Sequence, residues 1–223
     1  YTRPYAHALS RAAAAKGAKV DVHIKVDTGM HRVGASPREA AALAGEVASL
    51  RGLEVEGIYT HLANASLPGD TFTLRQWETF RQVLQEVEEA GLRIPLRHAA
   101  ASGAAISVPE SRLEMIRLGI AMYGLLPGAG FRGSLDLRPA LSLKTEVGHV
   151  FRACEAEGVS YGLTYKCERD AWIAVLPIGY ADGYSRALSN RGEVLVQGRR
   201  ARIAGVICMD MTMIDVTGIP GVA

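Results

Sequence analysis

The sequence predicts an α/β fold in its first part and a mainly β fold in its second. Strand-like and helix-like segments alternate up to about Leu137, and strand-like segments then follow one another with short turns. No long amphipathic helix occurs in this later part. Alternation is typical of a parallel sheet, whereas successive short strands are typical of a β domain. We therefore expect two domains, residues 1–136 and residues 137–223.

The elements of the first domain follow from apolar periodicity and from capping signals. Residues 3–16 are rich in alanine and favour a helix, and residues 19–27 alternate apolar and polar side chains as a strand does. Capping boxes that begin at Ser36 and Thr73 predict two helices, which Gly52 and Gly91 end. The other predicted elements are strands at 53–60, 96–99 and 113–116 and a short helix at 101–107.

In the second domain, apolar runs separated by short turns predict five strands, and Gly198 fits the turn of a hairpin. The runs are 140–152, 172–178, 193–196, 200–208 and 211–216.

Composition narrows the class of protein. The 223 residues carry a net charge of +2, which gives no electrostatic case for a nucleic-acid partner. The longest apolar runs are far too short to span a bilayer, so we expect no membrane partner. Three cysteines without CxxC spacing fit a reduced, cytoplasmic setting better than a disulfide framework. No HxH or HExxH pattern occurs, and we predict no metal site.

Polar side chains lie at or just after the carboxyl ends of the four predicted parallel strands. They are Lys25, Arg32, His61, Ser102 and Arg117. A (β/α)8 barrel of the TIM type assembles its active site at this face, and an open doubly wound sheet also binds ligands there. Polar loops after strands are common even without a site. A complete barrel takes roughly 250 residues. The sequence therefore predicts a partial barrel, with about half of it upstream of Tyr1.

Two of these polar residues, and also Tyr161 in the second domain, have both a functional and a plainer interpretation. Arg117 interrupts an apolar run and Gly119 follows, a pairing that suits an anionic ligand such as a phosphate. The plainer alternative is an arginine that pairs with a carboxylate. Lys25, if directed into a barrel, needs a partner or a modification, but it is otherwise an exposed lysine on an edge strand. Tyr161, on a loop between glycines, is a hydrogen bonder or a proton carrier.

Six motifs, in order, resemble those of bacterial alanine racemases, which are pyridoxal 5'-phosphate (PLP) enzymes with a barrel and a β domain. The motifs are Lys25–Arg32 (KVDTGMHR), Thr60-His61, Arg117–Gly124, Val159–Gly162, Ile178–Gly183 and Ile207–Asp210. The resemblance extends over essentially the whole chain. The resemblance implies interconversion of L- and D-alanine for peptidoglycan synthesis. It also implies a cytoplasmic homodimer with shared active sites.

The resemblance assigns the PLP cofactor to residues of the first domain. Arg117 would face the pyridine nitrogen, and His61 would lie near the ring and help to position the catalytic tyrosine. Ser102 and the backbone N–H groups of Gly119 and Ile120 would bind the phosphate.

The resemblance assigns the substrate to other residues. Tyr161 would be the catalytic base on one face of the substrate, and it would act in the active site of the partner subunit. Arg32 would contact the cofactor and the substrate, Met209 would line the substrate carboxylate site, and Lys25 matches a lysine that is carbamylated in several members. The substrate entrance would include Tyr180, Asp210 and Arg186.

Two departures from the family pattern bear on activity. Ala101 stands where the family commonly has an asparagine before the phosphate-binding serine. The motif around the family's Schiff-base lysine does not occur, so we expect a piece of a longer protein, inactive without a companion amino-terminal segment. A serine racemase of the same family is an alternative function. A non-catalytic PLP-binding or interaction remnant is another.

Overall fold

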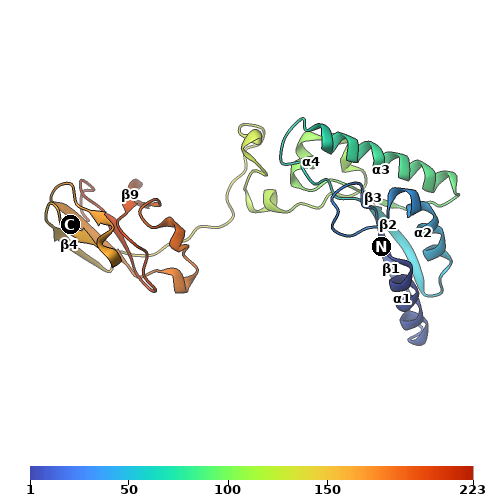
Figure 1. The fold of residues 1–223 in the computed structure, drawn as a ribbon, viewed down its shortest axis with the longest axis horizontal. Coiled ribbons are helices and arrows are strands. Elements are labelled where there is room, and N and C mark those ends of the chain that lie inside the picture. The colour runs from blue at the N-terminus through green and yellow to red at the C-terminus, as the bar shows by residue number, and fades with distance from the viewer. Residues whose placement is uncertain (223) are drawn as a thin grey trace. The chain divides into compact units, whose positions relative to one another are not determined.

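A computed structural model describes residues 1–222, and the chain divides into two compact units, Tyr1–Leu141 and a second that begins at Ser142 (Figure 1). The first is an α/β unit and the second a β unit, so the predicted fold class is confirmed. No helix within residues 1–222 is both long and apolar enough to cross a membrane.

The first unit is built on a parallel three-stranded sheet with the order β1-β2-β3. Helix α2 lies against β1 and β2, and α3 lies beside α2 (Figure 1). The bounds are α1 Arg3–Ala15, β1 Val20–Lys25, α2 Pro37–Ser49, β2 Leu53–Tyr59, α3 Thr71–Glu89, β3 Leu96–His98 and α4 Ser102–Ser107. Short 3-10 turns follow: η1 Pro109–Arg112, η2 Ile120–Tyr123 and η3 Ala129–Phe131.

The core of the first unit lies between the sheet and these two helices. Ile58 of β2 and Phe80 of α3 are both fully buried, and Leu43 and Val47 of α2 pack with them. Burial of such a side chain stabilises a fold by about 1.5–3 kcal/mol, so this cluster fixes the positions of the strand ends that follow.

Two predicted elements differ from the structure. Residues 113–116 form no strand, because Leu113 has φ 47° and turns the chain, and only Arg117 pairs with Ala101 as an isolated parallel bridge. Helix α3 begins at Thr71 rather than at the predicted capping box. Its cap is Asp70, whose carboxylate accepts the Thr73 backbone N–H at 2.8 Å.

The second unit contains a five-stranded antiparallel sheet with the order β4-β7-β10-β9-β8 and a separate two-stranded ladder, β5-β6. The strands are β4 His149–Ala153, β5 Gly158–Val159, β6 Tyr165–Lys166, β7 Ala171–Leu176, β8 Glu193–Val196, β9 Arg199–Ile203 and β10 Thr212–Asp215. Three 3-10 turns connect them: η4 Tyr161–Leu163, η5 Tyr180–Asp182 and η6 Arg186–Leu188.

The predicted strands of this unit are longer than the observed ones at two places. The run 140–152 becomes a strand only at His149, and the run 200–208 leaves the sheet after Ile203. Residues 205–210 then form an irregular connection to β10, which we call the 205–210 connection. Ile207 within it is fully buried, so its apolar character reflects core packing rather than strand pairing.

Candidate active site

The side chain of Arg117 contacts the carboxyl ends of two of the parallel strands, β2 and β3. One guanidinium nitrogen, Nη2, donates to the Thr60 carbonyl at 2.9 Å and to the Ala99 carbonyl at 3.1 Å, just beyond β2 and β3. The bridge between Arg117 and Ala101 places this residue at the same edge of the sheet. The first unit therefore brings together polar groups that are far apart in the sequence.

Arg117 contacts neutral groups rather than a carboxylate. Its guanidinium contacts Nδ1 of His98 and lies 3.3 Å from Nδ1 of His61, and its carbon lies 5.1 Å from the centre of the Tyr59 ring. Burial lowers the pKa of Arg117, but a guanidinium stays charged at neutral pH. It forms no ion pair within residues 1–222. A cation without a counter-ion is suited to an electron-rich ligand atom.

His98 and His23 extend this contact into a chain of hydrogen bonds. Because Arg117 only donates, Nδ1 of His98 must accept, and its protonated Nε2 donates to Nδ1 of His23 at 2.8 Å. Nε2 of His23 then donates to the Glu56 carboxylate at 3.0 Å. Burial, Arg117 and His23 together lower the pKa of His98 to about 4, which keeps this ring neutral. The chain thus connects a cation to a carboxylate through two histidine rings.

Gly57 makes room for the His23 ring. The two residues are register partners on β2 and β1, with a register irregularity between Val22 and His23. A Cβ at position 57 would lie 2.3 Å from Nδ1 of His23, which is far inside van der Waals contact. The histidine chain therefore depends on a glycine in the neighbouring strand.

Three cations surround His61. Burial lowers the pKa of this half-buried ring, and Arg117, Arg32 and Lys25 lower it further. Lys25 is 4% exposed, and its Nζ donates to the Val33 carbonyl at 2.5 Å. Burial, followed by Arg32 and Arg117, lowers the pKa of Lys25. The interpretation of Lys25 as an exposed edge residue is therefore wrong, whereas Arg32 itself is exposed.

Ser102 and the residues after Arg117 form a second group of polar atoms. Ser102 is buried at the first turn of α4, and its hydroxyl oxygen accepts the N–H groups of Gly119 at 3.0 Å and Ala121 at 3.2 Å. Ile120 lies between these two residues in the chain. Backbone N–H groups and a hydroxyl, without a carboxylate among them, are the groups that bind phosphate in proteins. These residues fit the phosphate of a cofactor such as PLP.

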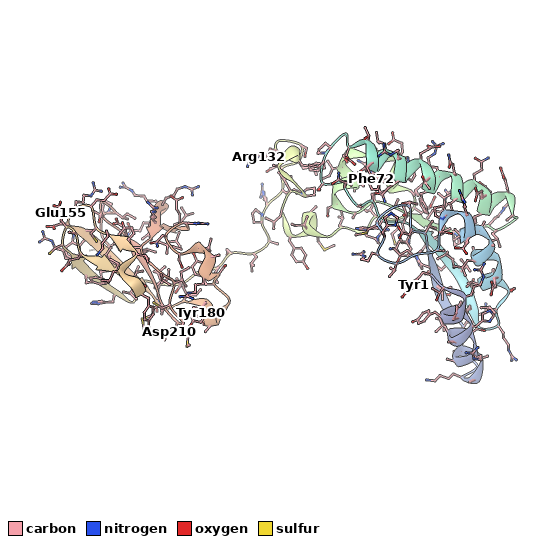
Figure 2. The ribbon with its side chains drawn as sticks, viewed as in Figure 1. Tyr1, Phe72, Arg132, Glu155, Tyr180 and Asp210 are labelled. Carbon is pink, nitrogen blue, oxygen red and sulfur yellow. The ribbon has the colours of Figure 1, made fainter. Side chains whose placement is uncertain are left out.

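In the second unit, the predicted residues gather around the 205–210 connection. Tyr161 lies on η4, between β5 and β6, with its side chain 70% exposed. Ser160 beside it donates its hydroxyl to the Val206 carbonyl at 2.5 Å. The backbone N–H of Tyr180 donates to the Cys208 carbonyl at 3.0 Å, and Figure 2 shows Tyr180 and Asp210 at the same end of this unit.

The remaining predicted residues belong to the same region. Met209 is 59% exposed, and its carbonyl accepts the Ala181 N–H at 2.9 Å. Arg186 opens η6, and its carbonyl accepts the Ser189 hydroxyl at 2.6 Å. That hydroxyl in turn accepts the Ile207 N–H at 3.0 Å. The structure thus places the predicted residues in two groups, one in each unit.

Sequence reasoning missed the histidine chain, which consists of His98 and His23. It also missed the contacts that hold the loop around Tyr161, residues 160–164, which we call the tyrosine loop. The available signal was the presence of His23 and His98 in two strands of the same predicted sheet, where a buried ring without a hydrogen-bond partner is costly. Asn190, which bonds to both Thr164 and Gly205, gave no signal beyond its position in a turn.

An α/β unit with polar groups at its strand ends, followed by a β unit with an exposed tyrosine, is consistent with a partial barrel joined to a β domain. The family model for the alanine racemase N-terminal domain matches residues 1–127, and that for the C-terminal domain matches residues 140–223. The chain belongs to the alanine racemase family, as its motifs predicted.

Individual relatives agree with this assignment. The chain is 45% identical to the alanine racemase of Halothermothrix orenii, a match that covers 96% of this chain and 56% of that protein. It is 43% identical to that of Desulfovibrio desulfuricans, covering 100% and 60%. The solved alanine racemase of Clostridium difficile 630 matches with a TM-score of 0.89 at 35% identity, covering 96% and 56%. The chain thus spans less than two thirds of the length of these relatives.

Proposed function

We propose that the protein carrying this chain interconverts L- and D-alanine with PLP as its cofactor. The observation that carries this proposal is the guanidinium of Arg117, which forms no ion pair with any residue from 1 to 222. It lies at the strand ends, where Arg117 pairs with Ala101 and the Gly119 amide bonds to Ser102. When bound, PLP supplies an electron-withdrawing ring that acidifies the α C–H bond of an amino acid.

Each residue of the first unit has a distinct part in this proposal. Arg117 would donate to the pyridine nitrogen and keep it unprotonated, because a guanidinium has no acidic proton to give at neutral pH. Ser102, with the amides of Gly119 and Ile120, would hold the phosphate, and His61 would lie beside the ring. The support is the convergence of Arg117 with His61 and the donor set around Ser102.

Tyr161 removes or returns the α-proton on one face of the substrate. Its exposed phenol leaves it free to reach a ligand, and by family resemblance that ligand belongs to the partner subunit of a homodimer. Met209 lines the substrate carboxylate site, Arg32 contacts cofactor and substrate, and the entrance consists of Tyr180, Asp210 and Arg186. We further infer a cytoplasmic setting, in which D-alanine serves peptidoglycan synthesis.

Lys25 is the proposed site of carbamylation. Its lowered pKa favours the neutral amine, whose lone pair attacks the carbon of CO₂ and which then loses one proton to give a carbamate anion. The product is an anion, which the positive charges of Arg32 and Arg117 would stabilise, whereas the same charges lower the pKa of the amine. Intact mass with and without added bicarbonate tests this proposal.

The activity itself is tested by incubating the purified protein with L-alanine or L-serine, with and without PLP, and measuring the D-enantiomer. D-Alanine that forms only with PLP supports the proposal. D-Serine in preference to D-alanine points to a serine racemase, and PLP binding without turnover points to a cofactor-binding role. No PLP binding at all would overturn the assignment of the cofactor site.

Two further measurements address the subunit arrangement. The 223-residue chain assayed alone tests the prediction that it is inactive without a companion segment. Mixed dimers of Tyr161→Phe and Arg117→Ala chains regain activity if the tyrosine serves the other subunit. No recovery in an otherwise active protein contradicts sharing.

A further inference from the structure

Asn190 connects two segments of the second unit through a single side chain. Its Oδ1 accepts the Gly205 N–H at 2.8 Å, and its Nδ2 donates to the hydroxyl oxygen of Thr164 at 2.9 Å. Its own backbone N–H donates to the Gly205 carbonyl at 3.2 Å. Thr164 directly follows the η4 turn that carries Tyr161. The amide therefore joins the far end of the tyrosine loop to the start of the 205–210 connection.

The tyrosine loop has a backbone that needs such support. Ser160 has φ 64° and Leu163 has φ 49°, both in the left-handed region that side chains with a Cβ rarely adopt. Gly162 between them has φ 67°. Conformations of this kind persist only where the surroundings hold them, and they cluster at functional sites.

The near end of the loop is held by Ser160 and by the lack of a side chain at Gly205. The Ser160 hydroxyl donates to the Val206 carbonyl at 2.5 Å. A Cβ at Gly205, which is buried with φ 92°, would lie 2.6 Å from the Ser160 Cβ and 2.6 Å from the Val159 carbonyl oxygen. Both ends of the loop are thus fixed on the same two residues, Gly205 and Val206.

We propose that Asn190 is a positioning residue for Tyr161. Together with Thr164 and Gly205, it fixes the loop in its left-handed conformation and so sets the direction of the phenol, whose own side chain is exposed. The catalytic consequence rests on the proposed racemase function, whereas the restraint on the loop does not. Asn190 itself has φ 57°, a conformation that asparagine tolerates better than most residues. The experiment must therefore distinguish a role in its own turn from a role in positioning Tyr161.

Asn190→Gly separates the two roles, because glycine accepts the positive φ at no cost and removes only the side chain. Thr164→Val deletes the hydroxyl on the other side of the contact, and Thr164→Ser retains it. The matched control is Gln197→Gly, since Gln197 is another turn residue of this unit with positive φ, 48°. The measurements are amide hydrogen exchange of residues 160–165 by mass spectrometry, the urea midpoint, and steady-state kinetics of the purified protein.

One hydrogen bond contributes about 1 kcal/mol, so we expect exchange in residues 160–165 to rise about 5-fold in Thr164→Val and at least as much in Asn190→Gly, which also loses the bond to Gly205. Thr164→Ser and Gln197→Gly should stay within about 2-fold of the parent, since neither loses that bond. In an active protein, kcat should fall about 10-fold with KM unchanged in Asn190→Gly and Thr164→Val, whereas Thr164→Ser should retain the kcat of the parent. Unchanged exchange in Asn190→Gly, or equal effects in Gln197→Gly, would overturn the proposal. An inactive parent protein would refute the racemase function while leaving the exchange result to decide the role of Asn190.

Discussion

The two units hold their key groups in opposite ways. In the first, the side chain of Arg117 is partly buried and bonds to the carbonyls of Thr60 and Ala99 and to two histidine rings. In the second, the phenol of Tyr161 is 70% exposed, and the loop around it is held through Ser160 and Thr164. One group is fixed by its own contacts and the other by those of its neighbours.

Because of this difference, we expect a substitution at Arg117 and a substitution at Tyr161 to have different effects on stability. Around Arg117 the groups assigned to the cofactor also satisfy buried polar atoms of the fold, so function and stability depend on the same side chain. At Tyr161 the side chain contributes little to folding, so function and stability depend on different residues. The two tryptophans report on the two units separately, because Trp77 lies in α3 and Trp172 in β7.

The largest expected effect separates catalysis from folding in the second unit. We expect Tyr161→Phe to lower kcat by about 10²–10⁴-fold, the usual contribution of an acid or base. The free energy of unfolding should change by less than about 0.5 kcal/mol, because the phenol is exposed. Racemisation assays and urea denaturation followed by Trp172 fluorescence check both values. A large loss of stability would show that the tyrosine is a structural residue.

Arg117→Ala should lower both the stability of the first unit and its affinity for PLP. Removal of the guanidinium leaves the Thr60 and Ala99 carbonyls and Nδ1 of His98 without their donor. At about 1–3 kcal/mol for each unsatisfied buried group, partly offset by water, we expect a loss of about 4 kcal/mol. Trp77 fluorescence in urea measures this loss, and PLP titration measures the accompanying loss of affinity. If only the PLP affinity falls, the two functions of Arg117 are separate.

The histidine chain predicts a pH dependence confined to the first unit. The pKa of His98 is about 4 in the folded state and about 6.5 in an unfolded chain, so the unfolded state binds more protons between these values. The neutral ring therefore contributes its full stability above about pH 6.5, and about 3 kcal/mol is lost as the pH falls to 4. His98→Asn, which retains an acceptor for Arg117, should flatten this part of the profile. An equal slope in both proteins would contradict the assignment.

The sequence predicted the architecture of the first unit because its signals are local. Alternation along residues 19–27 and the Ser36 box act over a few residues, and the structure places β1 at Val20–Lys25 and α2 at Pro37–Ser49. Residues 113–116 have the composition of a strand but do not pair as one, because the positive φ of Leu113 and the 3-10 turn before it interrupt the extended chain. That outcome depends on packing beyond the segment itself.

The candidate site was predictable where motifs carried it, as at Arg117 and Ser102, and not where it depends on contacts across the sheet. The contact between His23 and His98 joins residues 75 positions apart, and no pattern in the sequence pairs them. The function of Gly57 was likewise invisible, because only the register between β1 and β2 shows that it faces His23.

Gly57→Ala tests this hidden contact and has the smallest expected effect. The added methyl group would lie 2.3 Å from Nδ1 of His23, so the ring must move and the chain from Arg117 to Glu56 must break. Overpacking of this kind costs about 1–3 kcal/mol. Gly45→Ala is the matched control, because its methyl group meets only Leu92 at 3.8 Å and alanine favours the helix by roughly 0.5–1 kcal/mol. Opposite shifts of the Trp77 urea midpoint in the two variants would support the contact, and a stabilised Gly57→Ala would refute it.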